Sequence, residues 1–262
     1  MSRPPDVPFD APAVERGMGF FETVLLAGRR AVLWEPHLAR LSRTLRRFSL
    51  PEPDRSRIDA AARQVADEAA LRPGEERGLR LGWIALASDL DAPASWRLDV
   101  SVRPVPETTL ARRKGARAVT LPPDLRRDTP DVKSTSYFAA FLGLRIARTR
   151  GGDEGIFTAP DGTCIEGTST SLLAWNGGTP AHAPTGALPS VTAAAFLGEL
   201  DVRLPLTPAL LRDGCLLLGS LTLASPIVTL DGAPCAVPSP MGERIRDFNR
   251  RLLFDPQLGT ML

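Results

Sequence analysis

The sequence predicts an α/β protein of two domains, a small α+β domain over residues 1–108 and a larger α/β domain over residues 109–262. Three observations lead to this prediction. The first half combines β-prone apolar runs with amphipathic helix patterns, and the second half alternates short strands with helices. Between them, the proline-rich segment at residues 104–109 is typical of a linker. A chain of 262 residues is long enough for one large domain or two small ones.

The small domain is predicted to begin with a β-hairpin. An apolar β-prone run at residues 20–27 and a second run at residues 31–34 flank the turn at residues 28–30. Beyond the hairpin the sequence predicts a helix that begins at Pro36, a helix over residues 54–71, and strands over residues 79–87 and 96–103.

The helix at Pro36 has a clear pattern, and proline is well tolerated in a first helical turn. Apolar residues recur at spacings of three and four positions and so share one face: Leu38, Leu41, Leu45 and Phe48. Arg40 lies about 120° around the helix from the centre of this face, which places it at the flank of the apolar stripe.

The larger domain is predicted to mix short strands and helices. Its strands are expected at residues 116–121, 155–158, 164–175, 215–219 and 226–230, with a turn at residues 161–162. Its helices are expected at residues 135–150, 189–200, 208–213 and 239–254.

The composition limits the chemistry that is open to the chain. It holds 30 arginines but only two lysines, two histidines, three cysteines and one tyrosine. A zinc site would need nearly all of the histidines and cysteines, and no C-x-x-C or H-x-x-x-H pair occurs, so we expect no metal site. No G-x-S-x-G elbow accompanies either histidine, which argues against a Ser-His-Asp hydrolase. A reaction that needs a primary amine has only Lys114 and Lys133 to choose from.

Charge and hydropathy indicate a cytoplasmic protein that acts on a small molecule. The net charge is +2, and the arginines are scattered near acidic residues, whereas a nucleic-acid site needs a concentrated basic face. No signal peptide is visible in residues 1–17, and the longest apolar stretch, residues 215–230, is too short and too polar to span a bilayer. Three irregularly spaced cysteines favour reduced thiols. We therefore expect neither a nucleic-acid nor a membrane partner.

Taken one by one, the candidate residues carry little information. Lys114 follows two arginines in a charged turn and is expected to be solvated. Lys133 precedes an apolar helix, a junction from which an amine can point into a cavity. The other four candidates are each compatible with an ordinary structural place. These places are a helix cap for Glu166, a helix flank for Arg40, a helix N-terminus for Thr192 and a strand end for Ser220.

The order of six motif blocks is far more specific than any single residue. The blocks are Arg16-Gly-Met-Gly-Phe-Phe-Glu-Thr23, His37-Leu-Ala-Arg-Leu41, Lys133-Ser-Thr-Ser-Tyr137, Gly152-Asp-Glu154 with Asp161-Gly-Thr-Cys-Ile-Glu166-Gly-Thr-Ser, Leu188-Pro-Ser-Val-Thr192, and Ser220-Leu followed by Pro226-Ile. Together they resemble the class IV aminotransferases, the fold-type IV pyridoxal-phosphate (PLP) enzymes. This family includes branched-chain aminotransferase, D-amino-acid aminotransferase and aminodeoxychorismate lyase. The resemblance implies a D-amino-acid aminotransferase-like fold with a β-barrel-like larger domain, PLP at the domain interface, and a homodimer.

For three residues the resemblance implies a role at the cofactor ring. Lys133 would carry PLP as a Schiff base and then serve as the catalytic acid and base that moves the substrate's proton. Glu166 would face the pyridine nitrogen and keep it protonated, which makes the ring an electron sink. Tyr137, one helical turn beyond Lys133, would reach the ring oxygen O3′.

At the phosphate end the resemblance implies four further cofactor-binding residues. Arg40 would pair with the phosphate dianion through a charge-assisted contact. The amides of Val191 and Thr192, at a helix N-terminus, would form an anion site. The hydroxyls of Thr192 and Ser220 would complete the cradle.

Departures from the family pattern bear on the substrate. The usual Asp, Asn and Gly are replaced at three positions that leave the cofactor-binding groups in place: Met18, Ser171 and Ser190. D-Amino-acid aminotransferases hold the substrate carboxylate with an arginine and a tyrosine, and this chain has Ala85 and Phe21 there. The segment Arg80-Leu-Gly-Trp does not resemble the branched-chain Y-I-R-P stretch.

These departures and the compact length favour aminodeoxychorismate lyase, which forms 4-aminobenzoate, a precursor in folate biosynthesis, and pyruvate from 4-amino-4-deoxychorismate. The alternative is an aminotransferase that acts on a D- or branched-chain L-amino acid and a 2-oxo acid, because both reactions use every residue named above. A catalytically silent binding protein is a minor alternative, disfavoured by the presence of Lys133 and Glu166. Candidate anchors for a dicarboxylate substrate are Arg80, Arg126 and Arg127.

Overall fold

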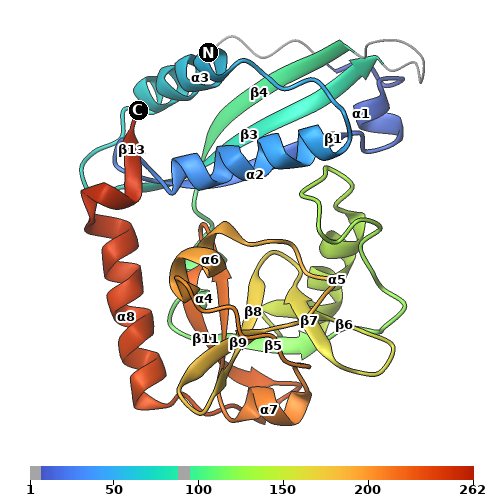
Figure 1. The fold of residues 1–262 in the computed structure, drawn as a ribbon, viewed down its shortest axis with the longest axis vertical. Coiled ribbons are helices and arrows are strands. Elements are labelled where there is room, and N and C mark those ends of the chain that lie inside the picture. The colour runs from blue at the N-terminus through green and yellow to red at the C-terminus, as the bar shows by residue number, and fades with distance from the viewer. Residues whose placement is uncertain (1–6, 88–94) are drawn as a thin grey trace.

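The structure is a computed structural model that describes residues 7–87 and 95–262 of the chain. The chain folds into two β-sheets, each with its own helices, which lie one above the other in Figure 1. This is the mixed α/β architecture that the sequence predicts. Residues 1–6, part of the segment searched for a signal peptide, lie outside the described residues.

The first sheet has five strands in the order β13-β2-β1-β3-β4, and all of its pairings are antiparallel. Its strands are β1 (Gly19–Ala27), β2 (Arg30–Val32), β3 (Glu76–Ala87), β4 (Ser95–Pro104) and β13 (Gly259–Met261). Helices α2 (Trp34–Arg47) and α3 (Arg55–Glu68) pack on one face and bury a shared apolar core with it.

The ends of these elements follow from local sequence. Gly28 makes the turn between β1 and β2 with φ +59°, a left-handed conformation that glycine adopts without steric cost. Asp54 caps α3, because its carboxylate accepts the amide of Ser56 at 2.7 Å. Helix α2 ends before Phe48, which is 42% exposed and therefore lies outside the apolar stripe to which the sequence assigned it.

The second sheet has eight strands and curls into a nearly closed barrel. Its strands follow the path β7-β6-β5-β11-β10-β8-β9, with β12 paired to β11. The barrel-like larger domain implied by the family resemblance is thus confirmed. The strands are β5 (Ala116–Thr120), β6 (Glu154–Thr158), β7 (Cys164–Gly167), β8 (Ser171–Asn176), β9 (Thr179–His182), β10 (Cys215–Gly219), β11 (Leu223–Leu230) and β12 (Ala233–Pro234).

Four helices lie around this barrel, and one long helix connects it with the first sheet. The four are α4 (Glu107–Arg112), α5 (Phe138–Thr149), α6 (Val191–Leu197) and α7 (Pro208–Arg212). Helix α1 (Pro12–Glu15) and the 3-10 turn η1 (Pro256–Leu258) lie beside the first sheet, where they contact β3 and β13. The long helix α8 (Ser239–Phe254) runs along one side of the molecule and leads the chain back to the first sheet (Figure 1). Among the described helices, none has the length and apolar character needed to cross a membrane.

Several elements differ from the sequence prediction. The single strand expected at residues 164–175 is two strands, β7 and β8, separated by a turn at residues 168–170. Helix α4 occupies part of the expected linker. Elements that the sequence did not predict are α1, β9, β12, η1 and β13. The domain boundary at residues 108/109 stays a prediction, and the pairing of β13 with β2 adds residues 259–261 to the first sheet.

Candidate active site

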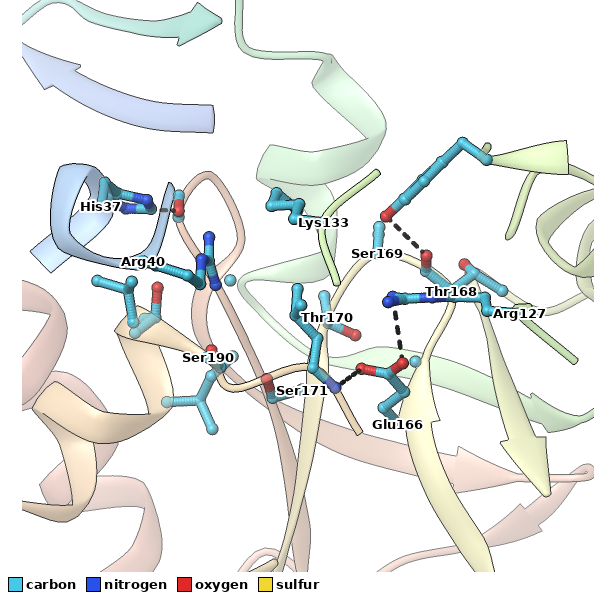
Figure 2. Close-up of a pocket in the computed structure, with 18 residues that line it drawn as sticks. His37, Arg40, Arg127, Lys133, Glu166, Thr168, Ser169, Thr170, Ser171 and Ser190 are labelled. Carbon is cyan, nitrogen blue, oxygen red and sulfur yellow. Dashed lines mark hydrogen bonds and ion pairs between the residues drawn. The ribbon is translucent and has the colours of Figure 1, made fainter. Parts of the chain in front are cut away.

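A pocket between the two sheets is lined by side chains from both halves of the chain (Figure 2). All seven residues predicted to bind the cofactor line it: Arg40, Lys133, Tyr137, Glu166, Val191, Thr192 and Ser220. Within the described residues, no group of three or more His, Cys, Asp or Glu side chains is arranged to hold a metal ion.

Lys133 is placed by a short extended segment that runs beside β1. The backbone oxygen of Lys133 accepts the amide of Phe21 at 3.0 Å, and the amide of Thr135 donates to the oxygen of Gly19 at 2.8 Å. Gly19 permits this approach, since a Cβ there would lie 2.9 Å from Oγ1 of Thr135. Burial, aided by the nearby charge of Arg40, lowers the pKa of Lys133 to about 8. The amine is therefore close to its titration range at neutral pH.

The ring of Phe21 brings three functional side chains together. The amine of Lys133 lies 4.5 Å from the ring centroid, and the guanidinium carbon of Arg80 lies 3.9 Å from it. The ring of Tyr137 meets Phe21 edge-on, with 5.4 Å between centroids. Arg80 thus approaches the Lys133 region through Phe21, although it is not among the residues that line the pocket itself.

Glu166, on β7, is held at both oxygens. Its Oε1 lies 3.2 Å from a guanidinium nitrogen of Arg127, and its Oε2 accepts the amide of Leu188 at 3.0 Å (Figure 2). Burial raises the pKa of Glu166 to about 6, against the opposing effect of Arg127. Arg127 also donates to the backbone oxygens of Pro130 and Val132, so it ties Glu166 to the segment that leads into Lys133.

Tyr137 is fixed by the turn between β7 and β8. Its hydroxyl donates to the backbone oxygen of Thr168 at 3.0 Å, and burial raises its pKa to about 12. Glu154 anchors this turn at residues 168–170. It is fully buried and pairs with Arg112. Glu154 accepts the Thr168 hydroxyl at 2.5 Å and the Ser169 amide at 2.9 Å. This acid therefore supports the loop that carries one side of the pocket.

Arg40, on α2, is buried because it pairs with an acid on β1. Its Nε and one terminal nitrogen donate to the two oxygens of Glu22 at 2.8 and 2.5 Å. Its other terminal nitrogen donates to the backbone oxygen of Pro189 at 2.9 Å, next to the start of α6. The first turn of α6 supplies Val191 and Thr192 to the same wall. This wall combines a guanidinium with a helix N-terminus, an arrangement suited to an anion.

Three buried residues of the site region were not among the predicted site residues: Glu22, His37 and Glu154. All three stand inside the motif blocks, in Phe-Glu-Thr, His-Leu-Ala-Arg and Asp-Glu, so their position in the blocks was the available signal. Of the predicted substrate anchors, one lies outside this pocket and another is already paired with an acid. Arg126 is exposed and outside this pocket, whereas Arg127 is paired with Glu166.

The sequence profile of the family described as amino-transferase class IV matches residues 19–230. The chain belongs to the class IV aminotransferase family. As a class IV aminotransferase family member it is a PLP-dependent enzyme.

One sequence relative and one solved structure resemble this class IV chain over much of its length. It is 37% identical, over 183 residues, to a protein of Mycobacterium tuberculosis named bifunctional aminodeoxychorismate lyase / D-amino acid transaminase. The match covers 63% of this chain and 60% of that protein. A hypothetical aminotransferase from Mycobacterium tuberculosis, in its PLP-bound form, superposes with a TM-score of 0.84 at 28% identity, covering 97% of this chain and 96% of that one.

A second similar structure shows the fold alone. It is a putative 4-amino-4-deoxychorismate lyase from Legionella pneumophila, with a TM-score of 0.81 at 17% identity, covering 96% of this chain and 97% of that one.

The pocket residues of this class IV enzyme fit PLP chemically. A buried amine, a buried carboxylate and a guanidinium line one cavity, and these groups match the aldehyde, ring nitrogen and phosphate of the cofactor. Thr170 lines the same cavity, and its buried hydroxyl oxygen has no hydrogen-bond partner among the described residues. Buried polar atoms are normally paired, so this hydroxyl is an exception next to the cavity.

Proposed function

We propose that this enzyme is a 4-amino-4-deoxychorismate lyase, which forms 4-aminobenzoate and pyruvate. The observation that carries the proposal is the free guanidinium of Arg80 beside Phe21 and Lys133. Within the described residues, Arg80 makes no hydrogen bond or ion pair, although it is half-buried. Buried or half-buried charges are normally paired, so an unpaired one beside an amine indicates an anionic substrate.

The positive charge around Arg80 suits a substrate with more than one carboxylate. Burial, together with the nearby charge of Arg103, lowers the pKa of Arg80. Arg80 pairs with Ser101 across β3 and β4, so Arg103 projects from the same face of the sheet two residues along. A Cβ at Gly78, which is on this face, would contact Leu221 in the turn between β10 and β11, so the face looks toward the second sheet. An aminodeoxychorismate molecule carries two carboxylates, one on its ring and one on its enolpyruvyl group, and these match two arginines.

Each of the pocket residues would have its own role in the lyase reaction. Bound PLP supplies an electron sink that acidifies the carbon bearing the substrate's amine. Lys133 takes the proton from that carbon, since an amine with a pKa of about 8 both accepts and returns protons near neutral pH. Glu166 holds a negative charge at the ring-nitrogen side, and Arg127 keeps its carboxylate in place. Arg40, Thr192 and Ser220 hold the phosphate end.

Transamination of a D-amino acid is a second candidate activity. The name of the relative from Mycobacterium tuberculosis carries both activities, and it favours this alternative over branched-chain L-amino acids. Incubation of the PLP form with aminodeoxychorismate, followed by a pyruvate assay, tests the first proposal. Parallel incubation with D-alanine and D-glutamate, followed by detection of pyridoxamine phosphate, tests the second. Pyridoxamine phosphate without pyruvate from aminodeoxychorismate would rule out the lyase.

The role of Arg80 predicts a specific kinetic effect. We expect Arg80→Gln to raise KM for aminodeoxychorismate roughly 10- to 100-fold, because a charge-assisted hydrogen bond contributes about 1.5–3 kcal/mol. The matched control is Arg126→Gln, which removes an exposed arginine outside the pocket and should leave KM unchanged. Equal KM values for both variants would remove Arg80 from the substrate site.

We further propose that the enzyme is a cytoplasmic homodimer. Support comes from α5, where Phe138 and Phe141 are 74% and 63% exposed at a spacing that places them on one helix face. A second copy of the chain would cover them. The three described cysteines are all free, which agrees with a reducing compartment.

A further inference from the structure

Three polar side chains form a hydrogen-bonded chain that begins behind the pocket and ends at its wall. Oε2 of Glu22 lies 2.8 Å from Nδ1 of His37, and Nε2 of the same ring lies 3.2 Å from the hydroxyl of Ser220. Glu22 and His37 are each 1% exposed. Figure 2 shows His37 at the pocket wall close to Arg40. The chain therefore connects a buried acid with the proposed phosphate end.

The direction of the first hydrogen bond follows from the charge on Glu22. Burial by itself raises the pKa of Glu22, but Arg40 and His37 outweigh burial and hold the pKa at about 2. The ionised carboxylate only accepts hydrogen bonds, so Nδ1 of His37 carries a hydrogen and donates it.

The direction of the second hydrogen bond follows from the first. Burial lowers the pKa of His37, with Arg40 and Lys133 adding to the effect and Glu22 opposing it. A neutral ring with its hydrogen on Nδ1 has a bare Nε2, which accepts the hydroxyl hydrogen of Ser220. Ser220 then offers only lone pairs to the pocket, and lone pairs repel a phosphate oxygen.

We propose that His37 is a positioning residue that gains a proton when a phosphate dianion enters the pocket and thereby turns the Ser220 hydroxyl toward that dianion. A hydronium ion or a buffer acid in the solvent gives up the proton, so its bond to hydrogen breaks while an N–H bond forms at Nε2. The new N–H then donates to Ser220, whose own hydrogen becomes available for the phosphate. This inference rests on the proposed placement of the cofactor phosphate between Arg40 and Ser220.

The charges around His37 make this response physically reasonable. Glu22 faces it from β1, Arg40 from α2, Lys133 from the segment before α5, and Ser220 from the loop between β10 and β11. One acid faces two basic groups, so the surroundings without phosphate disfavour an imidazolium. A dianion on the far side of the Ser220 hydroxyl reverses this balance, because a nearby opposite charge favours the charged form of a histidine.

Nitrogen-15 NMR of the histidine side chains tests the proposal directly, because the chain has only two histidines. His182→Gln assigns the signals, since His182 is paired with Asp201 and lies outside the pocket. The probe is pyridoxamine 5′-phosphate, which has no aldehyde to react with Lys133. Pyridoxamine without phosphate is the matched control ligand.

In the free protein we expect His37 to show a protonated Nδ1 and an unprotonated Nε2. With pyridoxamine phosphate both nitrogens should be protonated, and with pyridoxamine the free-protein pattern should persist. A neutral His37 in the phosphate complex, or an imidazolium in the free protein, would overturn the inference while leaving the lyase proposal intact. Failure of pyridoxamine phosphate to bind, measured by its own fluorescence, would overturn the phosphate placement as well.

A second measurement separates proton coupling from simple structural support. Uptake of one proton makes the affinity for pyridoxamine phosphate fall by up to about tenfold per pH unit as pH rises from the pKa of free His37 to the higher pKa of bound His37, and level off above it. Relative to the wild-type protein, His37→Gln should lose this component of the pH dependence, and His182→Gln should keep it. If His37→Gln weakens binding by the same factor at every pH between 6 and 8.5, the residue only supports the structure and the proposal fails.

Discussion

Lys133 and Lys114 show how one residue type acquires two properties from its surroundings. Lys114 is exposed in the charged turn before β5, where the sequence predicts it to be solvated. Lys133 is buried among charged groups, and burial lowers its pKa to about 8. A neutral amine is nucleophilic and an ammonium is not, so pH controls whether the amine reacts with an aldehyde.

This difference predicts a pH-dependent reaction with PLP. The rate of covalent attachment to the free protein should rise as pH increases toward 8 and level off above it, because the lowered pKa makes the amine neutral there. Borohydride reduction followed by mass spectrometry measures the adduct. Lys114→Arg should retain the adduct and Lys133→Arg should abolish it, since arginine does not give up its proton. An adduct in Lys133→Arg would contradict the assignment.

At this scale the motif blocks were informative, whereas the partners of each residue were not predictable. The order of the blocks selected seven cofactor candidates, and all seven line one pocket in the structure. The pairing of Arg40 with Glu22 depends on how α2 packs on β1, and helical periodicity placed Arg40 only at the flank of the helix. The pairing of Arg127 with Glu166 likewise joins segments that are distant in sequence.

At the scale of elements, the extended segment at residues 133–135 holds Lys133 beside β1. Gly19→Ala would place a Cβ 2.9 Å from Oγ1 of Thr135 and 3.1 Å from Cγ2 of Ile84. We expect a loss of about 1–3 kcal/mol in the free energy of unfolding, as for other overpacked sites, and weaker PLP binding because Lys133 shifts. Denaturant unfolding and PLP titration measure the two effects.

The control for this substitution is Gly242→Ala in α8. The nearest atoms to a Cβ there lie at 3.5 Å, and alanine favours a helix, so stability should be unchanged or increased and PLP affinity retained. Equal PLP affinity in both variants would show that the segment tolerates displacement.

The elements that the sequence missed share a physical reason. The turn at residues 168–170 has the sequence Thr-Ser-Thr, which lacks glycine, proline and asparagine and so gives no turn signal. It is held by the buried carboxylate of Glu154, a tertiary contact. Strand β13 has three residues, too few for a period-two pattern to be recognised.

For the whole molecule, the exposed face of α5 predicts the oligomeric state. Phe138→Glu should convert the proposed dimer into a monomer or weaken it strongly, because a carboxylate buried in an apolar interface lacks a partner. Sedimentation velocity measures the mass. Phe254→Glu at the end of α8, where the native side chain is 71% exposed, is the control and should stay dimeric. A wild-type monomer at micromolar concentration would refute the dimer.

The return of β13 to the first sheet has a consequence for biosynthesis. The strand pairs with β2, and Arg29 donates to the backbone oxygen of Leu262 at 2.7 Å, so the sheet that carries Glu22 and supports Lys133 is completed by residues near position 260. A ribosome makes β1 and β2 first and β13 more than 220 residues later. The barrel is therefore synthesised in full before the first sheet gains its edge strand. During translation the first sheet therefore has an unpaired edge at β2 until residues 259–261 have been synthesised.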